Sequence, residues 1–234
     1  MIVLPSRPLV AFFGFVLVGC GGSSEPASET SRAGGPSASA GPPVEFRGAP
    51  ARAGRLSLLS GSVRFVACGD TGQGAAVEDA SGAGKAAVDE FGGKGVMAVV
   101  RLEGNRLQEV RYAAPEGPGC DQLPPHGEVE ARGNEPFWLI RVDGATAYLR
   151  RPQNPEEQEY ERGAWSQPAP STWRYDAERD RDGKAQSLTL ELSEARCTDS
   201  MSGAWYPFRA VIVRNGRKTE GCALEGRQSF RQSP

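Results

Sequence analysis

The sequence predicts an all-β protein, made of small antiparallel barrel or sheet segments braced by disulfides, that follows a signal peptide and a disordered tether. Thirty glycines and eighteen prolines in 234 residues favour short strands and turns over long helices. Several runs alternate polar and apolar residues, as in strands with one buried face. Four cysteines follow the one near the N-terminus, an even number that is typical of exported, disulfide-bonded proteins.

Residues 1–19 have the pattern of a signal peptide. Arg7 precedes an apolar run over 9–18, and this run is about half of the roughly 20 residues that a membrane-spanning helix needs. Leu17-Val18-Gly19-Cys20 resembles the lipobox of bacterial lipoproteins, which implies cleavage before Cys20 and acylation of that cysteine. The predicted partner is therefore membrane lipid, bound through acylated Cys20. The alternative is an ordinary secretory signal with an incidental cysteine.

Residues 20–60 are predicted to form the lipidated cysteine and a flexible linker. The stretch 21–43 is almost entirely Gly, Ser, Pro and Ala without an aromatic side chain, so burial cannot offset the entropy lost on ordering. Gly21 stands where inner-membrane lipoproteins of enteric bacteria carry Asp. The resemblance therefore implies an outer-membrane anchor, with the folded part in the periplasm.

A first segment, at 61–124, is predicted to be a small OB-like β unit. The run 62–67 alternates polar and apolar residues, 85–91 suits a short helix, and Glu103-Gly104-Asn105 offers a tight turn between the β-like runs 96–102 and 107–113. This segment is similar in strand pattern to the small barrel of NlpE-type copper-resistance and stress-signalling lipoproteins. That resemblance implies an envelope role and brings no metal site.

A second segment, at 127–230, is predicted to be an antiparallel β domain. Asp143-Gly144, Asp182-Gly183 and Asn215-Gly216 tolerate the positive φ angles of two-residue hairpin turns. The three hairpins would pair the strands 137–142 with 146–150, 173–179 with 187–192, and 208–214 with 218–223. The stretch 152–172, rich in Pro, Gln and Glu, is predicted to be an exposed connection. All four tryptophans lie in this segment; we expect them to fill its core, the alternative being that they line a ligand groove.

The four remaining cysteines allow three pairings. We favour Cys68 with Cys120 and Cys197 with Cys222, because each of these pairs brackets elements of one segment. No C-x-x-C pair is present and His126 is the sole histidine, so no metal site is predicted.

The sequence also argues against several functional classes. A net charge of -2 leaves no basic footprint for nucleic acid. There is no G-x-S-x-G motif, and any histidine-dependent catalysis would rest on His126 alone. No catalytic residue, cofactor or enzymatic activity is predicted.

The second segment carries a further pair of motifs. Gly133-Asn134-Glu135-Pro136-Phe137-Trp138 is followed by Cys197-Thr198-Asp199-Ser200-Met201-Ser202, then by Tyr206-Pro207 and Gly221-Cys222. Over about residues 127–228 the chain resembles a family of bacterial envelope lipoproteins of unknown function with G-x-E-P-F-W and C-x-D-x-M-S motifs. Ser200 departs from the glycine expected there. The resemblance would place a binding surface at Glu135, Trp138, Asp199, Met201 and Tyr206, unless these residues serve to staple two strands.

These features together predict a membrane-anchored periplasmic lipoprotein with a non-enzymatic binding, stress-sensing or envelope-maintenance role. Its partner would be another envelope protein or the cell wall. Two alternatives stay open: a lysozyme inhibitor, because small disulfide-bonded β lipoproteins often serve as one, and a hydrolase that acts on peptidoglycan.

Overall fold

The computed structural model of the protein describes residues 51–123, 125 and 127–226. The predicted signal peptide, Cys20 and His126 lie outside the described residues. The first segment contains the helix α1 (Ala83–Glu90) and five strands: β1 (Ala51–Leu59), β2 (Ser62–Ala67), β3 (Ala75–Ala76), β4 (Val96–Glu103) and β5 (Arg106–Ala114). The second contains β6 (Val129–Asn134), β7 (Phe137–Asp143), β8 (Thr146–Arg151), β9 (Asn154–Ala169), β10 (Thr172–Arg181), β11 (Lys184–Thr198), β12 (Trp205–Arg214) and β13 (Arg217–Glu225).

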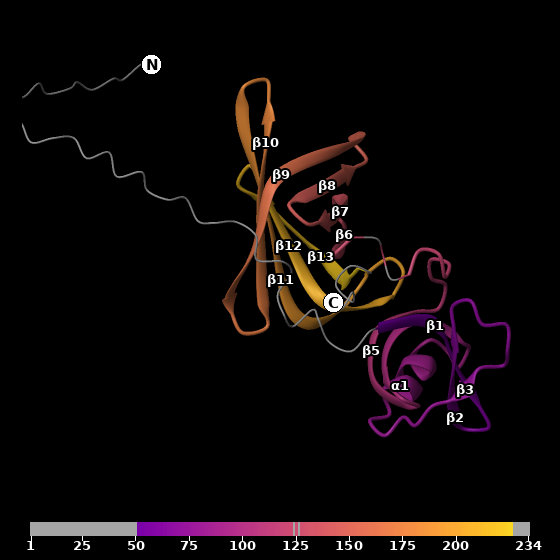
Figure 1. Ribbon diagram of the computed structural model, residues 1–234. Helices are drawn as coiled ribbons and strands as arrows, with labels where there is room; N and C mark the ends of the chain where they lie inside the picture. Colours follow the sequence, from indigo (N-terminus) through magenta and orange to yellow (C-terminus); the bar gives the residue numbers. More distant parts are fainter. Residues whose placement is uncertain (1–50, 124, 126, 227–234) are drawn as a thin grey trace, which may run out of the picture. The chain divides into compact units, whose positions relative to one another are not determined.

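Strands β6 to β13 form a closed antiparallel barrel (Figure 1). Each strand pairs with the next along the chain, and β13 pairs with β6 through Cys222–Arg132 and Glu225–Val129. The connection order is therefore that of an up-and-down barrel, whose closure leaves no unpaired edge in these eight strands. The predicted all-β fold, barrel and hairpins are confirmed.

The barrel interior is filled with side chains over most of its length. Inward positions alternate with outward ones, for example Trp173, Tyr175 and Ala177 on β10. Three of the four tryptophans (Trp138, Trp165 and Trp173) are buried in this core, as expected, but the expectation is wrong for Trp205, which packs into the core of the first segment. An eight-stranded barrel is just wide enough for such filling or for one small ligand.

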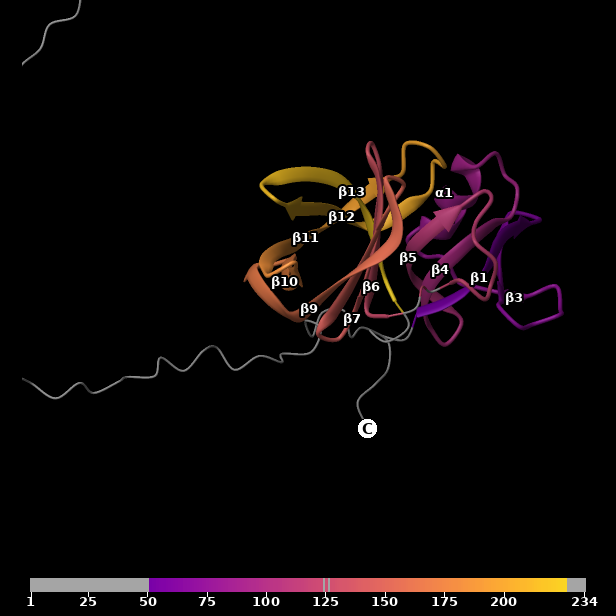
Figure 2. The same ribbon diagram turned by 90° about the horizontal axis from the view of Figure 1, so that it is seen from above.

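The first segment lies beside the barrel, with α1 next to its strands (Figure 2). Its strands follow the order β3-β2-β1-β4-β5, and α1 buries Ala87 and Val88 against Leu56, Val96 and other apolar residues. The expected helix is present, and the expected strands and hairpin are confirmed. The OB-like character of this segment remains a prediction.

The two segments share one hydrogen-bonded sheet network. Strand β5 pairs with β12 through Ala113 and Trp205, and the Trp205 side chain packs into the core of the first segment. The Glu90 carboxylate at the end of α1 accepts hydrogen bonds from Trp205 Nε1 and Arg196 Nη2, each at 2.9 Å. The first segment is thus tied to the outer wall of the barrel.

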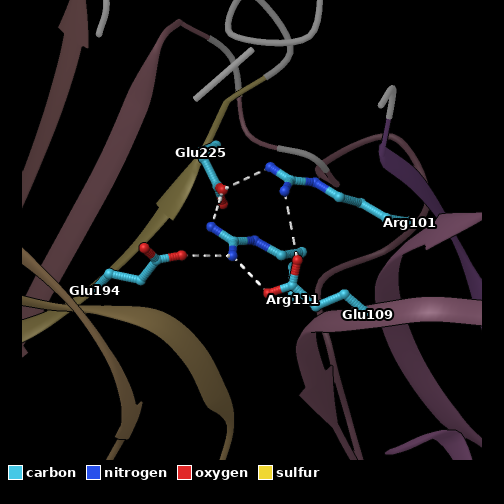
Figure 3. A network of polar contacts seen from close by, with 5 residues as sticks. All are labelled: Arg101, Glu109, Arg111, Glu194 and Glu225. Carbon is cyan, nitrogen blue, oxygen red and sulfur yellow. Dashed lines mark hydrogen bonds and ion pairs between the residues drawn. The ribbon is translucent and has the colours of Figure 1, made fainter. Parts of the chain in front are cut away.

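A buried ion network makes a second tie between the segments (Figure 3). Glu225 on β13 is completely buried and pairs with Arg111 on β5 and, at 3.5 Å, with Arg101 on β4. The Arg111 guanidinium also donates to Glu109 at 2.6 Å and lies 3.5 Å from Glu194. This network joins both strands of the β4–β5 hairpin to the end of the last barrel strand.

Two expectations about the strands were wrong, and one barrel strand was missed. The stretch 152–172 is mostly the 16-residue strand β9, not an exposed connection, and β6 was not predicted. The linker expected to reach residue 60 ends before it, because 51–59 form β1 between β2 and β4. The three predicted hairpins therefore supply six of the eight barrel strands, and β6 and β9 complete the barrel.

Both predicted disulfides are present. Cys68 is bonded to Cys120 and Cys197 to Cys222. The second bridge links the end of β11 to β13 across β12, to which both strands are paired. It therefore holds the start of the β11–β12 loop against the barrel wall.

Candidate functional site

Of the five residues that the family resemblance grouped, the structure brings two into one hollow: Glu135 and Asp199 line a pocket of about 690 Å³ beside the Cys197–Cys222 bridge. Trp138 is buried inside the barrel and Tyr206 is buried against Tyr112, with ring centroids 5.1 Å apart. Glu135 lies exposed in the β6–β7 turn, and Met201 is exposed in the β11–β12 loop, with 79% of its surface accessible. The five residues therefore do not all line one hollow.

What the two motifs do bring together is a turn and a loop. Asn134 Nδ2 at the end of β6 donates to Asp199 Oδ2 at 3.1 Å and lies 3.3 Å from Ser200 Oγ. The other oxygen of Asp199 accepts hydrogen bonds from the backbone N–H groups of Met201 and Ser202, at 3.0 and 2.7 Å. With both oxygens engaged, Asp199 holds the loop in shape, in agreement with the stapling alternative.

We expect Asp199 to make the loop acid-sensitive. Burial alone would raise the pKa of this carboxyl, but the hydrogen bonds from Ser202, Asn134 and Met201 outweigh it and lower the pKa below the ordinary value. The charged form is therefore favoured by folding. Its stabilisation is present above the ordinary aspartate pKa and is lost as the pH falls through the lower folded value. Asp199→Ala should reduce the free energy of unfolding by about 2 kcal/mol at pH 7, and by less near pH 2. Denaturant unfolding at both pH values measures this; an equal loss at both would contradict it.

The G-x-E-P-F-W motif has a packing explanation at the same end of β6. Gly133 faces Trp138 across the β6–β7 ladder, and a Cβ atom at Gly133 would lie 2.7 Å from Cε2 of the indole. A Cβ atom at Gly221 on β13 would lie 2.8 Å from Trp138 Cζ2. Both glycines leave the space that the large Trp138 ring occupies, so these motif residues shape the end of the barrel.

Above this ring, the core stops short of the barrel end and leaves a cavity of about 450 Å³. The cavity lies where β8 and β12 end and β13 begins. Its apolar lining includes Trp138, Leu149 and Ile212, and Arg151, Arg214 and Arg217 provide its charges. Pro136, Asn215 and Thr219 complete the lining.

The arginines are placed here by the alternation of the strands. On β12, Phe208, Ala210 and Ile212 face inward and Arg214 takes the next inward position; on β8, Arg151 follows Ala147 and Leu149. Arg179 continues the inward row of β10, and its guanidinium carbon lies 5.3 Å from the centre of the Tyr160 ring. Sequence reasoning missed this cluster. On each of these strands the arginine stands two residues after the last apolar inward position, so extending the alternation by one inward position predicts it.

The cavity is electropositive. None of its nine lining residues is acidic. Burial lowers the pKa of Arg214, and the neighbouring charges of Arg151 and Arg181 lower it further, while Tyr160 opposes the change. A lowered arginine pKa reflects a cation that lacks sufficient counter-charge.

The buried polar atoms around the cavity are mostly hydrogen-bond donors. Among the described residues, no partner is found for Arg151 Nε, for Arg214 Nε and Nη1, for Trp138 Nε1 or for the Tyr160 hydroxyl. The groups of this kind that can accept are Gln158 Oε1, on the strand position paired with Leu149, and the Tyr160 hydroxyl, which can also donate. Buried groups of this kind are normally satisfied, so this end of the barrel can accept a group rich in oxygen acceptors.

The described part of the chain contains no candidate metal site and no candidate membrane-spanning helix. No group of three or more His, Cys, Asp or Glu side chains there could hold a metal ion, and its single helix is not long and apolar enough to span a membrane. Fold and cavity together define an eight-stranded up-and-down barrel with a basic, partly apolar hollow at one end. Comparison with protein-family models, curated proteins and solved structures finds no match to this chain.

Proposed function

We propose that this chain is a membrane-anchored periplasmic lipoprotein whose barrel is a non-enzymatic binding module, with the hollow at the end of the barrel as its ligand site. One observation carries the proposal of binding: next to the packed core of the barrel, a cavity of about 450 Å³ lies at this end, between apolar side chains and three arginines. Binding sites are typically concave and largely apolar, with a few placed polar groups. The apolar floor and three arginines of this cavity match that description.

The anchoring part of the proposal rests on the sequence. The ten-residue apolar run and the lipobox-like Leu17-Val18-Gly19-Cys20 support export and acylation. The two disulfides are compatible with an oxidising compartment. An anchored barrel could report the presence of its ligand to another envelope component, which is how a stress-sensing or maintenance role would use the site.

Changing Cys20 to Ser tests the anchor. The wild-type protein should start at an acylated Cys20 and fractionate with the outer membrane, because buried acyl chains contribute about 0.8 kcal/mol per CH₂ group. Cys20→Ser, or inhibition of the lipoprotein signal peptidase with globomycin, should leave an uncleaved precursor. Mass spectrometry of the membrane fractions identifies each form.

Gly21→Ala provides a matched control beside the cysteine, and it should leave the processing unchanged. A wild-type protein that is released without a lipid and begins at another residue would contradict the anchor, while leaving the barrel site untouched.

A further inference from the structure

We infer that the cavity at the barrel end takes a compact organic anion, whose phosphate or carboxylate group lies against Arg151 and Arg214 and whose apolar part contacts Trp138. This inference rests on the proposed function, because it names the ligand class of the same site.

The first reason is the missing counter-charge. Several arginines elsewhere in the described chain, such as Arg111, Arg132 and Arg174, face carboxylates, and a few others, such as Arg179, bond neutral groups instead. For Arg151, Arg214 and Arg217 no ion pair is found among the described residues, although all three line one cavity. A partly buried cation without a counter-ion is costly, so a ligand anion would supply what the protein itself does not.

The second reason is the imbalance between donors and acceptors. Arginine offers only donors, and a phosphate or carboxylate offers only acceptors when ionised. The unpartnered atoms near the cavity include donors from Arg151, Arg214 and Trp138. A cationic or donor-rich ligand would leave all of these groups unsatisfied, whereas an anion would satisfy several of them at once.

The third reason concerns size. Below Trp138 the barrel is filled by Ile140, Tyr160, Leu190 and other core side chains that are fully buried. An extended acyl chain would have to displace these core side chains, so a compact apolar part that fits the cavity of about 450 Å³ between Trp138, Leu149 and Ile212 is favoured. A soluble organic anion is therefore favoured over a lipid tail. An anionic lipid headgroup shares the same chemistry and could present only its phosphate.

Calorimetric titration of the full-length protein in a non-ionic detergent tests the inference. Phenyl phosphate combines a ring with an anion, and benzyl alcohol and benzylamine are its neutral and cationic counterparts. Phenyl phosphate should bind at least about tenfold more tightly than benzyl alcohol, since hydrogen bonds to charged groups contribute about 1.5 to 3 kcal/mol each. Its affinity should fall as salt is added. Soluble dihexanoyl phosphatidic acid distinguishes the two sources of the anion, because tighter binding of it than of phenyl phosphate would identify a lipid headgroup.

Arg214→Gln should weaken phenyl phosphate binding by about tenfold or more. The matched control is Arg209→Gln, which removes the same charge from an exposed position of the same strand and should leave the affinity unchanged. Arg217→Gln serves as a second test, because Arg217 is exposed and its loss should not affect folding.

The outcomes separate the two proposals. Equal binding of phenyl phosphate and benzyl alcohol, both weakened by Thr219→Trp within the cavity, would overturn the anion inference and keep the cavity as a binding site. Failure of every probe to bind would overturn both. Binding of phenyl phosphate that Arg209→Gln weakens as much as Arg214→Gln and Arg217→Gln would also overturn the inference.

Discussion

Replacing Glu225 with alanine should destabilise the fold by about 3 to 5 kcal/mol, the range for removing one partner of a buried ion pair. Glu225 is completely buried, and Arg111, its main partner, has only 4% of its surface exposed. Without the carboxylate, the partners of Arg111 among the described residues would be Glu109, the more distant Glu194 and the ring of Phe208. The Arg101 Nη2 atom would also lose its pairing with this carboxylate. Chemical denaturation followed by circular dichroism measures the loss.

Two comparisons show whether the burial of the charge is responsible. Glu191→Ala removes a half-exposed carboxylate that lies 3.5 Å from Arg174, and surface pairs of this kind contribute about 1 kcal/mol or less. The double variant Arg111→Leu with Glu225→Leu should be less destabilised than Glu225→Ala, because neither charge of the main pair is left behind. If Glu225→Ala and Glu191→Ala lowered the free energy of unfolding equally, the buried network in Figure 3 would not be what holds the two segments together.

Replacing Gly133 with alanine should destabilise the barrel by about 3 kcal/mol, the upper part of the usual range for overpacking a core. The added methyl group would lie 2.7 Å from Trp138 Cε2 and still closer to Nε1 of that indole and to the backbone oxygen of Glu220. A backbone oxygen of a paired strand cannot move aside as a side chain can. Thermal unfolding monitored by near-ultraviolet circular dichroism would follow both the stability and the tryptophan environment.

Gly72→Ala is the control for this substitution. A Cβ atom at Gly72 would meet its nearest neighbour only at 3.9 Å, so the change should stay within about 0.5 kcal/mol of wild type, as surface substitutions usually do. If Gly133→Ala were as harmless as Gly72→Ala, the packing explanation of the G-x-E-P-F-W motif would be wrong.

Much of the fold could be predicted because turns and alternation are local signals. Asp182-Gly183 connects β10 to β11 with positive φ at both residues, and the sequence alone indicates this. Strand β9 escaped prediction because its inward row is irregular. Gln158 and Tyr160 are two residues apart, but the next buried residue is Trp165. The five-residue spacing from Tyr160 to Trp165 is made possible by the positive φ angle of Arg162 and by a register shift between β9 and β10. A bulge of this kind has no local sequence pattern that predicts it.

The missed strands β1 and β6 have a different cause. Strand β6 turns Val129, Ala131 and Gly133 inward, and such small residues give little apolar signal. Gly54 in β1 is required because a Cβ atom there would lie 2.6 Å from the Phe65 ring on β2. The sequence places this glycine among linker-like neighbours. Both strands are stabilised by pairing with strands that are distant in the sequence, and the local composition does not indicate this pairing.

The candidate site was only partly predictable for a related reason. Trp138 was singled out and does form the floor of the cavity. Glu135, Asp199, Met201 and Tyr206 lie elsewhere, because sequence motifs mark the packing of turns and loops as readily as they mark binding. The arginine cluster depends on barrel closure, which brings the ends of β8 and β12 to one hollow.

A crystal structure of the protein with phenyl phosphate tests the central claim most directly, because it locates the ligand. We expect the phosphate between the guanidinium groups of Arg151 and Arg214 and the ring over Trp138. A ligand bound instead to the outer surface beside Asp199, or an empty cavity at a ligand concentration that saturates binding in solution, would contradict the assignment of the barrel end as the binding site.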